Sequence, residues 1–209
     1  SRSDRQNLYG DTFFDLINQA PDVDLLVPDP DGTPYIFQGD PEGREENPLY
    51  VISTEDRTRQ RTRTQGSVES RFSPFEWLSF DGNVSYDRSD RRTDYFLDSG
   101  IKTEGFGSPA GGPGEISQSV GTTSALNAAL GANLLGKFGD FTLRSTFRTL
   151  LERETNESTT AEGTGLVTPG VSSLSNLQNR LSSSTLEEIR STGEIGSVGA
   201  DYQGKYIVD

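Results

Sequence analysis

Two stretches that alternate apolar and polar residues flank the short segment from Phe138 to Phe141. One parity before the segment carries Leu126, Ala128, Leu130, Ala132, Leu134 and Phe138, and the opposite parity after it carries Phe141, Leu143, Phe147 and Leu151. The Gly-Asp pair between them suits a tight β-hairpin, because glycine accepts a positive φ and aspartate tolerates it. Residues 138 and 141 then face each other, so both apolar sets lie on one face of a sheet.

The cleanest alternation lies earlier, over residues 78–87. Leu78, Phe80, Gly82, Val84 and Tyr86 share one parity, and polar residues fill the other. A period of two is that of a strand with one apolar face. The same reasoning predicts strands at about 59–72, 78–96, 118–138, 141–154, 193–202 and 205–209.

The connections between these predicted strands alternate in length. Residues 73–77, 139–140 and 203–205 form short turns, whereas 97–117 and 155–191 form long connections. Outer-membrane barrels have short turns at one end and long loops at the other.

A local signal inside the second long connection favours helix. Thr185 with Glu188 three residues later fits a capping box, which predicts a helical turn around 185–190. Residues 1–58 are expected to form a separate extracellular loop region, with a short helix at 12–17 and a turn at 28–32.

Strand length separates two all-β architectures. Strands of a soluble sandwich also alternate, but they usually run about five or six residues, and these patterns persist about twice as long. We therefore predict an all-β fold: an antiparallel sheet of long strands that is part of a large transmembrane β-barrel with long extracellular loops. The predicted membrane-facing residues are Leu78, Phe80, Val84, Leu126, Leu130, Leu134, Phe141, Leu143 and Phe147. The predicted interface aromatics are Phe72, Trp77, Phe138, Tyr202 and Tyr206.

Composition agrees with that fold and narrows the chemistry. The 209 residues are 31% hydrophobic and contain no apolar run of transmembrane-helix length. Neither a signal peptide nor an initial Met is present, so we expect an internal piece of a longer chain. A net charge of -13 argues against nucleic-acid binding. Because the chain has no Cys and no His, disulfides, imidazole metal sites and Ser-His-Asp catalysis are excluded.

Two charged patterns each have a plain and a functional interpretation. Five arginines lie at i, i+2 spacing or its multiples, which places them on one strand face: Arg57, Arg59, Arg61, Arg63 and Arg71. That face is either solvated, towards water or a lumen, or it binds an anion. Asp29 and Asp31 are spaced as in a calcium loop, but the later ligand positions are missing. A plain turn is favoured, and no metal site is predicted.

Candidate ligand-binding residues are three loop aromatics, Tyr35, Phe37 and Tyr50, which could stack on a sugar ring or pack within the loop. Paired carboxylates would suffice for glycosidase chemistry. The candidate pairs are Glu45 with Glu46, Glu152 with Glu154, and Glu187 with Glu188. Sequence adjacency does not establish a catalytic separation between two carboxylates, and Glu45 and Glu46 would point to opposite faces of an extended strand. We expect no enzyme and no cofactor.

Several segments occur in a particular order: Asn47-Pro48-Leu49-Tyr50, the Arg-rich strand, Phe75-Glu76-Trp77-Leu78-Ser79, residues 165–174, and residues 200–208. This order, from about residue 47 to 209, resembles the barrel region of SusC/RagA-like TonB-linked outer membrane receptors. The family's plug domain, TonB-contacting segment and terminal strand are not recognisable in the chain.

The resemblance implies a nutrient importer of the bacterial outer membrane, surrounded by lipid. It implies energy supplied through TonB, a SusD-like surface lipoprotein as partner, and oligosaccharide or peptide cargo. The alternative is a soluble secreted β-rich binding or adhesion module. The two differ in one structural feature, because a soluble module covers the apolar face that a barrel exposes.

Overall fold

The computed structural model describes residues 2–7, 12–38, 46–103 and 111–208. Glu45 and Asp209, which belong to a predicted carboxylate pair and a predicted strand, lie outside this part. Within the described residues, one antiparallel sheet contains all strands in sequence order. Its strands are β1 (Arg2–Asn7), β2 (Glu55–Phe75), β3 (Leu78–Leu97), β4 (Glu115–Phe138), β5 (Phe141–Leu166), β6 (Leu177–Tyr202) and β7 (Tyr206–Val208). The all-β prediction is confirmed.

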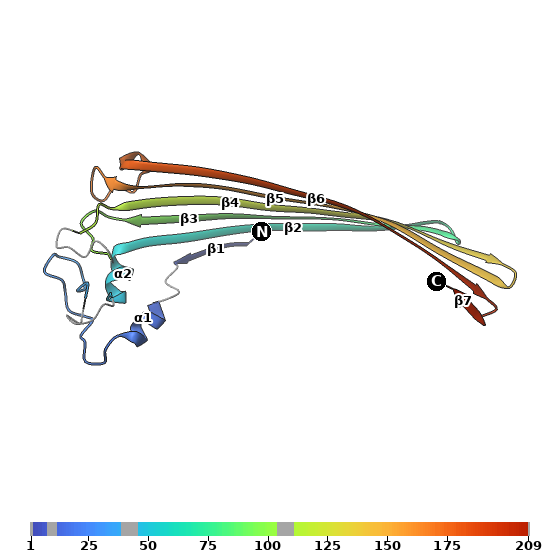
Figure 1. Ribbon diagram of the computed structural model, residues 1–209, viewed down its shortest axis with the longest axis horizontal. Coiled ribbons are helices and arrows are strands. Elements are labelled where there is room, and N and C mark those ends of the chain that lie inside the picture. Colours follow the sequence, from blue (N-terminus) through green and yellow to red (C-terminus); the bar gives the residue numbers. More distant parts are fainter. Residues whose placement is uncertain (1, 8–11, 39–45, 104–110, 209) are drawn as a thin grey trace.

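The sheet is long and narrow, with all long connections at one end (Figure 1). Helices α1 (Thr12–Asn18) and α2 (Pro48–Thr54) lie at that end, and a short 3-10 helix, Leu174–Asn176, lies between β5 and β6. Helix α1 matches the predicted helix at 12–17. Helix α2 was not predicted, although Asn47 caps it and Pro48 suits its first turn.

Three tight connections fix the register of the sheet. Phe138 pairs with Phe141 around Gly139, whose φ is +58°, and Tyr202 pairs with Tyr206. The first pairing is the one that the sequence predicts, and the second closes the predicted short turn at 203–205. Strands β2 and β3 meet through Phe75 and Leu78, after an irregularity beyond Phe72 that includes Pro74.

The predicted long connection at 155–191 is wrong in most of its length. Strand β5 continues to Leu166 and β6 begins at Leu177, so only residues 167–176 connect them. The predicted helical turn at 185–190 is also wrong, because these residues pair in register with β5. The isolated capping pattern is a local preference, and the long ladder of interstrand hydrogen bonds outweighs it.

Other predicted boundaries shift by a few residues. The predicted strand 59–72 begins earlier, at Glu55, and the predicted connection 97–117 shortens to 98–114. Short and long connections nevertheless alternate as predicted.

Buried apolar side chains are few and lie at the long-connection end. Ile116, Leu166 and Leu177 form one cluster, against which Phe96 and Leu174 pack. A Cβ placed on Gly114, whose φ is +79°, would lie 2.1 Å from Cδ1 of Leu166, so this cluster requires a glycine there. Among the described residues, neither helix has the length and apolar character needed to cross a membrane.

Candidate functional site

The pairing register gives the sheet two chemically different faces. Even-numbered residues of β2, β3, β4 and β6 share one face with odd-numbered residues of β5. In the half of the sheet near the short turns, this face is apolar, and we call it the apolar band. It contains Val68, Phe72, Leu78, Phe80, Val84, Tyr86, Leu126, Ala128, Leu130, Ala132, Leu134, Phe138, Phe141, Leu143, Phe147, Leu151, Val198, Ala200, Tyr202 and Tyr206.

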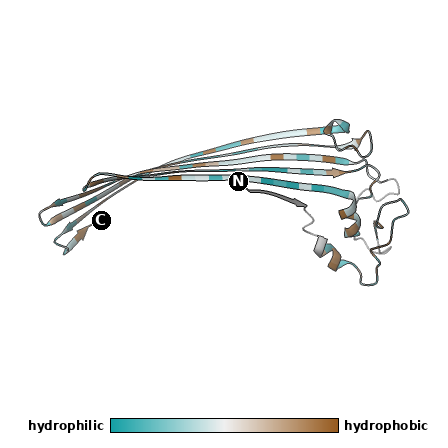
Figure 2. Cartoon of the chain, turned by 180° about the vertical axis from the view of Figure 1, so that it is seen from behind, coloured by the Kyte–Doolittle hydropathy of each residue, from teal (hydrophilic) through white to brown (hydrophobic). Residues whose placement is uncertain are grey.

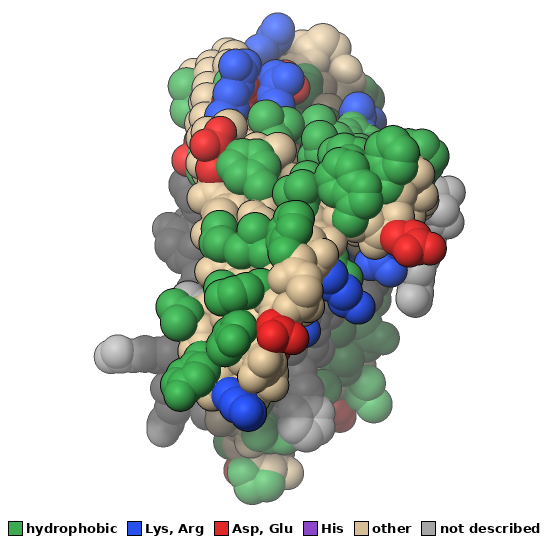
Figure 3. Space-filling view, turned by 90° about the vertical axis from the view of Figure 1, so that its right-hand side faces the viewer, with side chains coloured by type: hydrophobic (Ala, Val, Ile, Leu, Met, Phe, Trp, Pro, Cys, Tyr) green, Lys and Arg blue, Asp and Glu red, His purple; other side chains and the backbone are tan. Residues whose placement is uncertain are grey.

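No described element covers the apolar band. Val68 is 71% exposed, Leu130 58% and Phe147 48%. Apolar and polar residues alternate along the strands (Figure 2), and hydrophobic side chains gather where the sheet is viewed from its short-turn end (Figure 3). All predicted membrane-facing residues lie on this one face, although their contact with lipid stays a prediction. A face of this size without a covering layer marks an interaction surface or a membrane surface.

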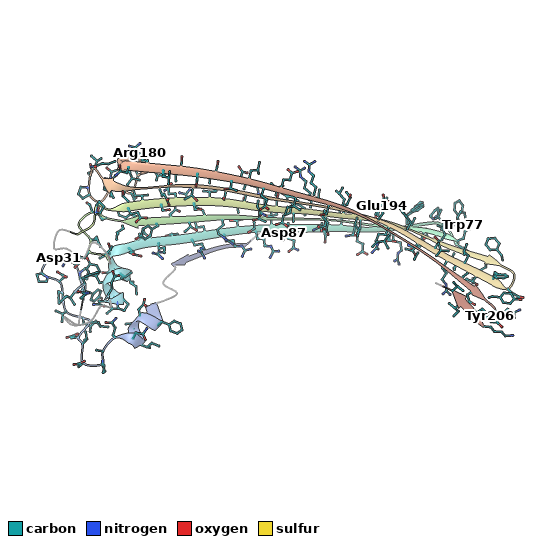
Figure 4. All side chains as sticks on the ribbon, in the orientation of Figure 1. Asp31, Trp77, Asp87, Arg180, Glu194 and Tyr206 are labelled. Atoms are coloured by element: carbon teal, nitrogen blue, oxygen red, sulfur yellow. The ribbon has the colours of Figure 1, made fainter. Side chains whose placement is uncertain are left out.

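Aromatic rings mark the short-turn edge of the apolar band. Phe75 and Trp77 stack with ring centroids 5.3 Å apart, and Tyr202 lies 4.6 Å from Phe141 and 6.5 Å from Tyr206 by the same measure. Figure 4 labels Trp77 and Tyr206 at this end of the sheet. The predicted interface aromatics thus lie towards one end of the sheet, and their place at a membrane interface stays a prediction.

The same face becomes charged farther from the short turns. Arg88 pairs with Asp90 at 3.0 Å, Arg92 with Asp94 at 2.8 Å, and Arg153 with Glu188 at 2.9 Å. On β6 the apolar band ends near Val198, because Gly196 and then Glu194 follow on the same face. The band therefore ends nearer the short turns on β6 than on β4.

The opposite face is polar even at the depth of the apolar band, and we call it the polar face. Arg148 reaches Asp81 at 2.7 Å across the intervening strand, passing over Gly131, which is in register with both. Asn133 donates to the same carboxylate at 2.8 Å, and Thr146 donates to Asn133 at 3.1 Å. The sheet thus has a polar network on one face and exposed leucines and phenylalanines on the other.

The arginine row lies on the polar face, as predicted. Arg61 donates to Ser89 at 3.0 Å, and Arg63 donates through Nε to Asp87 at 3.0 Å. Arg57 pairs with Glu55 at 3.0 Å, and its guanidinium carbon lies 5.0 Å from the ring centroid of a tyrosine on β3. These contacts support the interpretation of a solvated face, and an anion site stays a prediction.

The connection before β2 is joined to the connection after β3 by a group of ion-paired and packed residues, which we call the ion-paired cap. It comprises Asp29, Asp31, Phe37, Tyr50 and Lys102. The Nζ of Lys102 lies 2.9 Å from Asp29 and 3.0 Å from Asp31, and its backbone N–H donates to the Tyr50 hydroxyl at 2.9 Å. Asn47 donates to the carbonyl of Leu25 at 2.8 Å and is fully buried. Long-range polar contacts of this kind fix the loops relative to the sheet end.

Electrostatics in the cap follow from these contacts. Burial opposes ionisation of Asp31, but hydrogen bonds from Thr33 and Lys102 outweigh it and lower the pKa of Asp31 to about 2. The hydrogen bond to Asp29 raises the pKa of Lys102. Since an ammonium group lies between the two aspartates, the plain-turn interpretation holds for this segment. The described residues contain no cluster of three metal-ligating side chains.

The predicted ligand-binding aromatics occupy the same cap. Phe37 and Tyr50 are buried against each other, with centroids 5.3 Å apart in an edge-to-face arrangement. Tyr35 is half-buried. The ligand role of all three stays a prediction. Sequence reasoning missed Lys102 and Asn47, whose roles depend on partners 73 and 22 residues away.

The predicted carboxylate pairs are not arranged alike. Glu152 and Glu154 share the polar face, whereas Glu187 and Glu188 point to opposite faces. Glu188 is held by Arg153 and Arg190, and Glu154 accepts from Asn156 at 3.1 Å. Contacts of this kind, made here by Glu188 and Glu154, are ordinary for surface carboxylates.

A shallow hollow of about 410 Å³ lies on the polar face, midway along the strands. Its lining comes from β3, β4, β5 and β6 and consists of Ser89, Arg91, Thr93, Ser119, Gly121, Thr122, Thr123, Asn156, Glu157, Ser158, Thr185 and Glu187. Figure 4 labels Asp87, which lies two residues before the hollow begins on β3. No aromatic ring lines it.

A long antiparallel sheet with one uncovered apolar face and one hydrogen-bonded polar face is consistent with a segment of a β-barrel wall. Three solved structures share the fold: the RagAB peptide transporter, and the RagAB peptide importer in a closed-closed state and in an open-open state. Their TM-scores are 0.65, 0.63 and 0.65, at 10%, 11% and 11% sequence identity.

The similarity covers 81%, 80% and 90% of this chain but only 19%, 18% and 19% of the respective solved chains. This chain therefore spans about a fifth of the length of those chains. No protein-family model and no curated protein matches the sequence. At this identity the likeness shows a shared fold and nothing further.

Proposed function

We propose that this chain is a wall segment of a SusC/RagA-like, TonB-dependent outer-membrane receptor that imports oligosaccharides or peptides. The observation that carries the proposal is the uncovered apolar band, which is backed at the same depth by a polar network. Lipid covers such a band without another protein layer, and water or other polar groups cover the opposite face. The fold shared with the RagAB peptide transporter supports the same assignment.

The proposed role is structural and selective. The strands form the wall and the ion-paired cap forms part of its outer end, while a SusD-like lipoprotein and TonB act on other parts of the parent chain. The chain itself performs no catalysis and needs no cofactor in this proposal. Transport needs the closed barrel, since an open sheet leaves backbone groups unpaired in lipid.

Cysteine scanning tests the proposal directly, because this chain contains no cysteine. Single cysteines at residues 126–134 of the natural full-length protein, in intact cells, would be exposed to a lipid-dissolved and a water-soluble thiol reagent. Even positions should react with the lipid-dissolved reagent and odd positions with the water-soluble one.

Recovery of the protein from the medium as a water-soluble species, with no lipid-accessible position, would refute the proposal. That outcome would favour the soluble binding or adhesion module instead.

A further inference from the structure

The hollow on the polar face has opposite charges at its two ends. Arg91 lines it from β3 and Glu187 from β6, with β4 and β5 between them. In register, Arg91 lies opposite Gly121, which lies opposite Ser158, which lies opposite Thr185. Glu187 belongs to the neighbouring row, two residues along β6. The two charges therefore lie diagonally across the hollow.

Both charged groups are free to bind a ligand. Among the described residues, neither Arg91 nor Glu187 has an ion pair or a side-chain hydrogen bond, and both are exposed. This sets them apart from Arg57, Arg61 and Arg63 on the same face, which have side-chain partners.

The floor between the charges is small and rich in hydroxyls. Gly121 contributes no side chain, and the nearest atom to a Cβ placed there would be the Glu157 carbonyl oxygen at 3.8 Å. Hydroxyls of serine and threonine surround it on all four strands. They donate and accept hydrogen bonds, as the amide groups of a peptide backbone require.

The width of the hollow also suits a short extended peptide. Neighbouring strands lie about 4.8 Å apart, so three spacings separate the backbones of β3 and β6 by about 14 Å. Because an extended peptide rises about 3.4 Å per residue, a chain of roughly two to four residues spans the gap between the side-chain ends. The absence of an aromatic ring from the lining disfavours stacking on a sugar.

We propose that this hollow is a binding site for a short zwitterionic peptide, whose carboxylate pairs with Arg91 and whose ammonium group pairs with Glu187. The inference rests on the proposed transport function and adds a particular wall site to it. Charge-assisted hydrogen bonds of this kind position a ligand more strongly than neutral ones.

Calorimetric titration of the natural full-length protein in detergent tests the site. The probe is tetra-alanine with free ends, compared with tetra-alanine that is acetylated and amidated. We expect the free peptide to bind and the capped peptide to bind at least tenfold more weakly. Arg91→Gln and Glu187→Gln should each weaken binding of the free peptide about tenfold, which corresponds to about 1.4 kcal/mol.

Arg59→Gln and Glu162→Gln are the matched controls, because both residues lie on the polar face outside the hollow. They should bind the free peptide like the unchanged protein. If Arg91→Gln or Glu187→Gln bound the free peptide as tightly as the unchanged protein does, or if the unchanged protein did not bind it, the site would be overturned. Labelling of even-numbered single cysteines of β4 by the lipid-dissolved reagent, in the cell experiment described above, would show that the proposed wall function holds even if this site does not.

Discussion

At the scale of single residues, the glycines of the sheet have different tasks. Gly131 lies between Asp81 and Arg148, and a Cβ placed there would be 2.7 Å from a carboxylate oxygen of Asp81. Gly66, on β2, has no atom within 4 Å of that position. Gly131 therefore permits the ion pair between Asp81 and Arg148 across its own strand. Gly66 makes room for no other group and only lowers the stability of β2.

Alanine substitutions at these two glycines should change the stability of the protein differently. Gly66→Ala should stabilise the protein by about 0.5–1 kcal/mol, because alanine loses less backbone entropy than glycine on folding. Gly131→Ala should stabilise less than this or not at all, since the new methyl group displaces the Asp81 carboxylate from Arg148 and offsets the entropic gain. Denaturant unfolding of the full-length protein in detergent measures both, and equal stabilisation by the two variants would contradict the contribution of that ion pair.

At the scale of elements, the cap depends on one ammonium group. The side chain of Asp29 is 5% exposed and that of Lys102 20% exposed. Removing the lysine leaves a buried carboxylate without its counter-charge, which is costly.

Lys102→Met should therefore loosen the connection that carries Asp29 by about 2 kcal/mol, and Lys205→Met, at the opposite end of the sheet, should not. Hydrogen exchange of residues 29–37 measures the opening. Unchanged protection in Lys102→Met would show that the apolar contacts of Phe37 and Tyr50 suffice.

The cap should also respond to acid. The pKa of Asp31 is lowered from 3.8 to about 2, so its ionisation stabilises the cap above about pH 4. That contribution is lost as the pH falls from about 4 towards 2. The protection of the same residues, measured relative to the intrinsic exchange rate at each pH, should fall over this interval in the unchanged protein. Asp31→Asn should remove that part of the pH dependence.

Predictability from sequence also differs between elements. The halves of β4 and β5 near the Gly-Asp turn were predicted correctly, because one face is apolar and the other polar. Residues 155–166 and 177–191 were predicted wrongly, because both of their faces are mainly polar and the period of two disappears. Only a strand preference of residues such as Thr159 and Thr160 remained as a signal, and it is weak without a buried face.

The candidate site also has one part that the sequence predicts and other parts that it does not. Membership of the apolar band follows from parity once the turns are placed, so sequence alone was sufficient. The cap joins residues of two separate connections, and the hollow joins residues of four strands that lie far apart in the sequence. Arg91 and Glu187 come together only through the register of three successive strand pairs, which a single sequence does not specify.

At the scale of the whole molecule, the two faces of the sheet should differ in how well they tolerate a charged side chain on the same strand. Leu130→Arg should destabilise the folded protein in lipid vesicles by about 2–4 kcal/mol, because it places a charge in the apolar band. Ala129→Arg, one residue away on the polar face, should be nearly neutral. Folding into vesicles, followed by denaturant titration, measures the difference. Equal effects would mean that the faces do not separate lipid from water.

The alternation of short turns and long connections also limits how the length of this chain can change. A residue added within a strand reverses the parity of every position beyond it, until a bulge absorbs the change. Residues added between β3 and β4, or between β5 and β6, alter no pairing. Related chains should therefore differ in length by any number of residues at one end of the sheet, and within the strands mainly by twos.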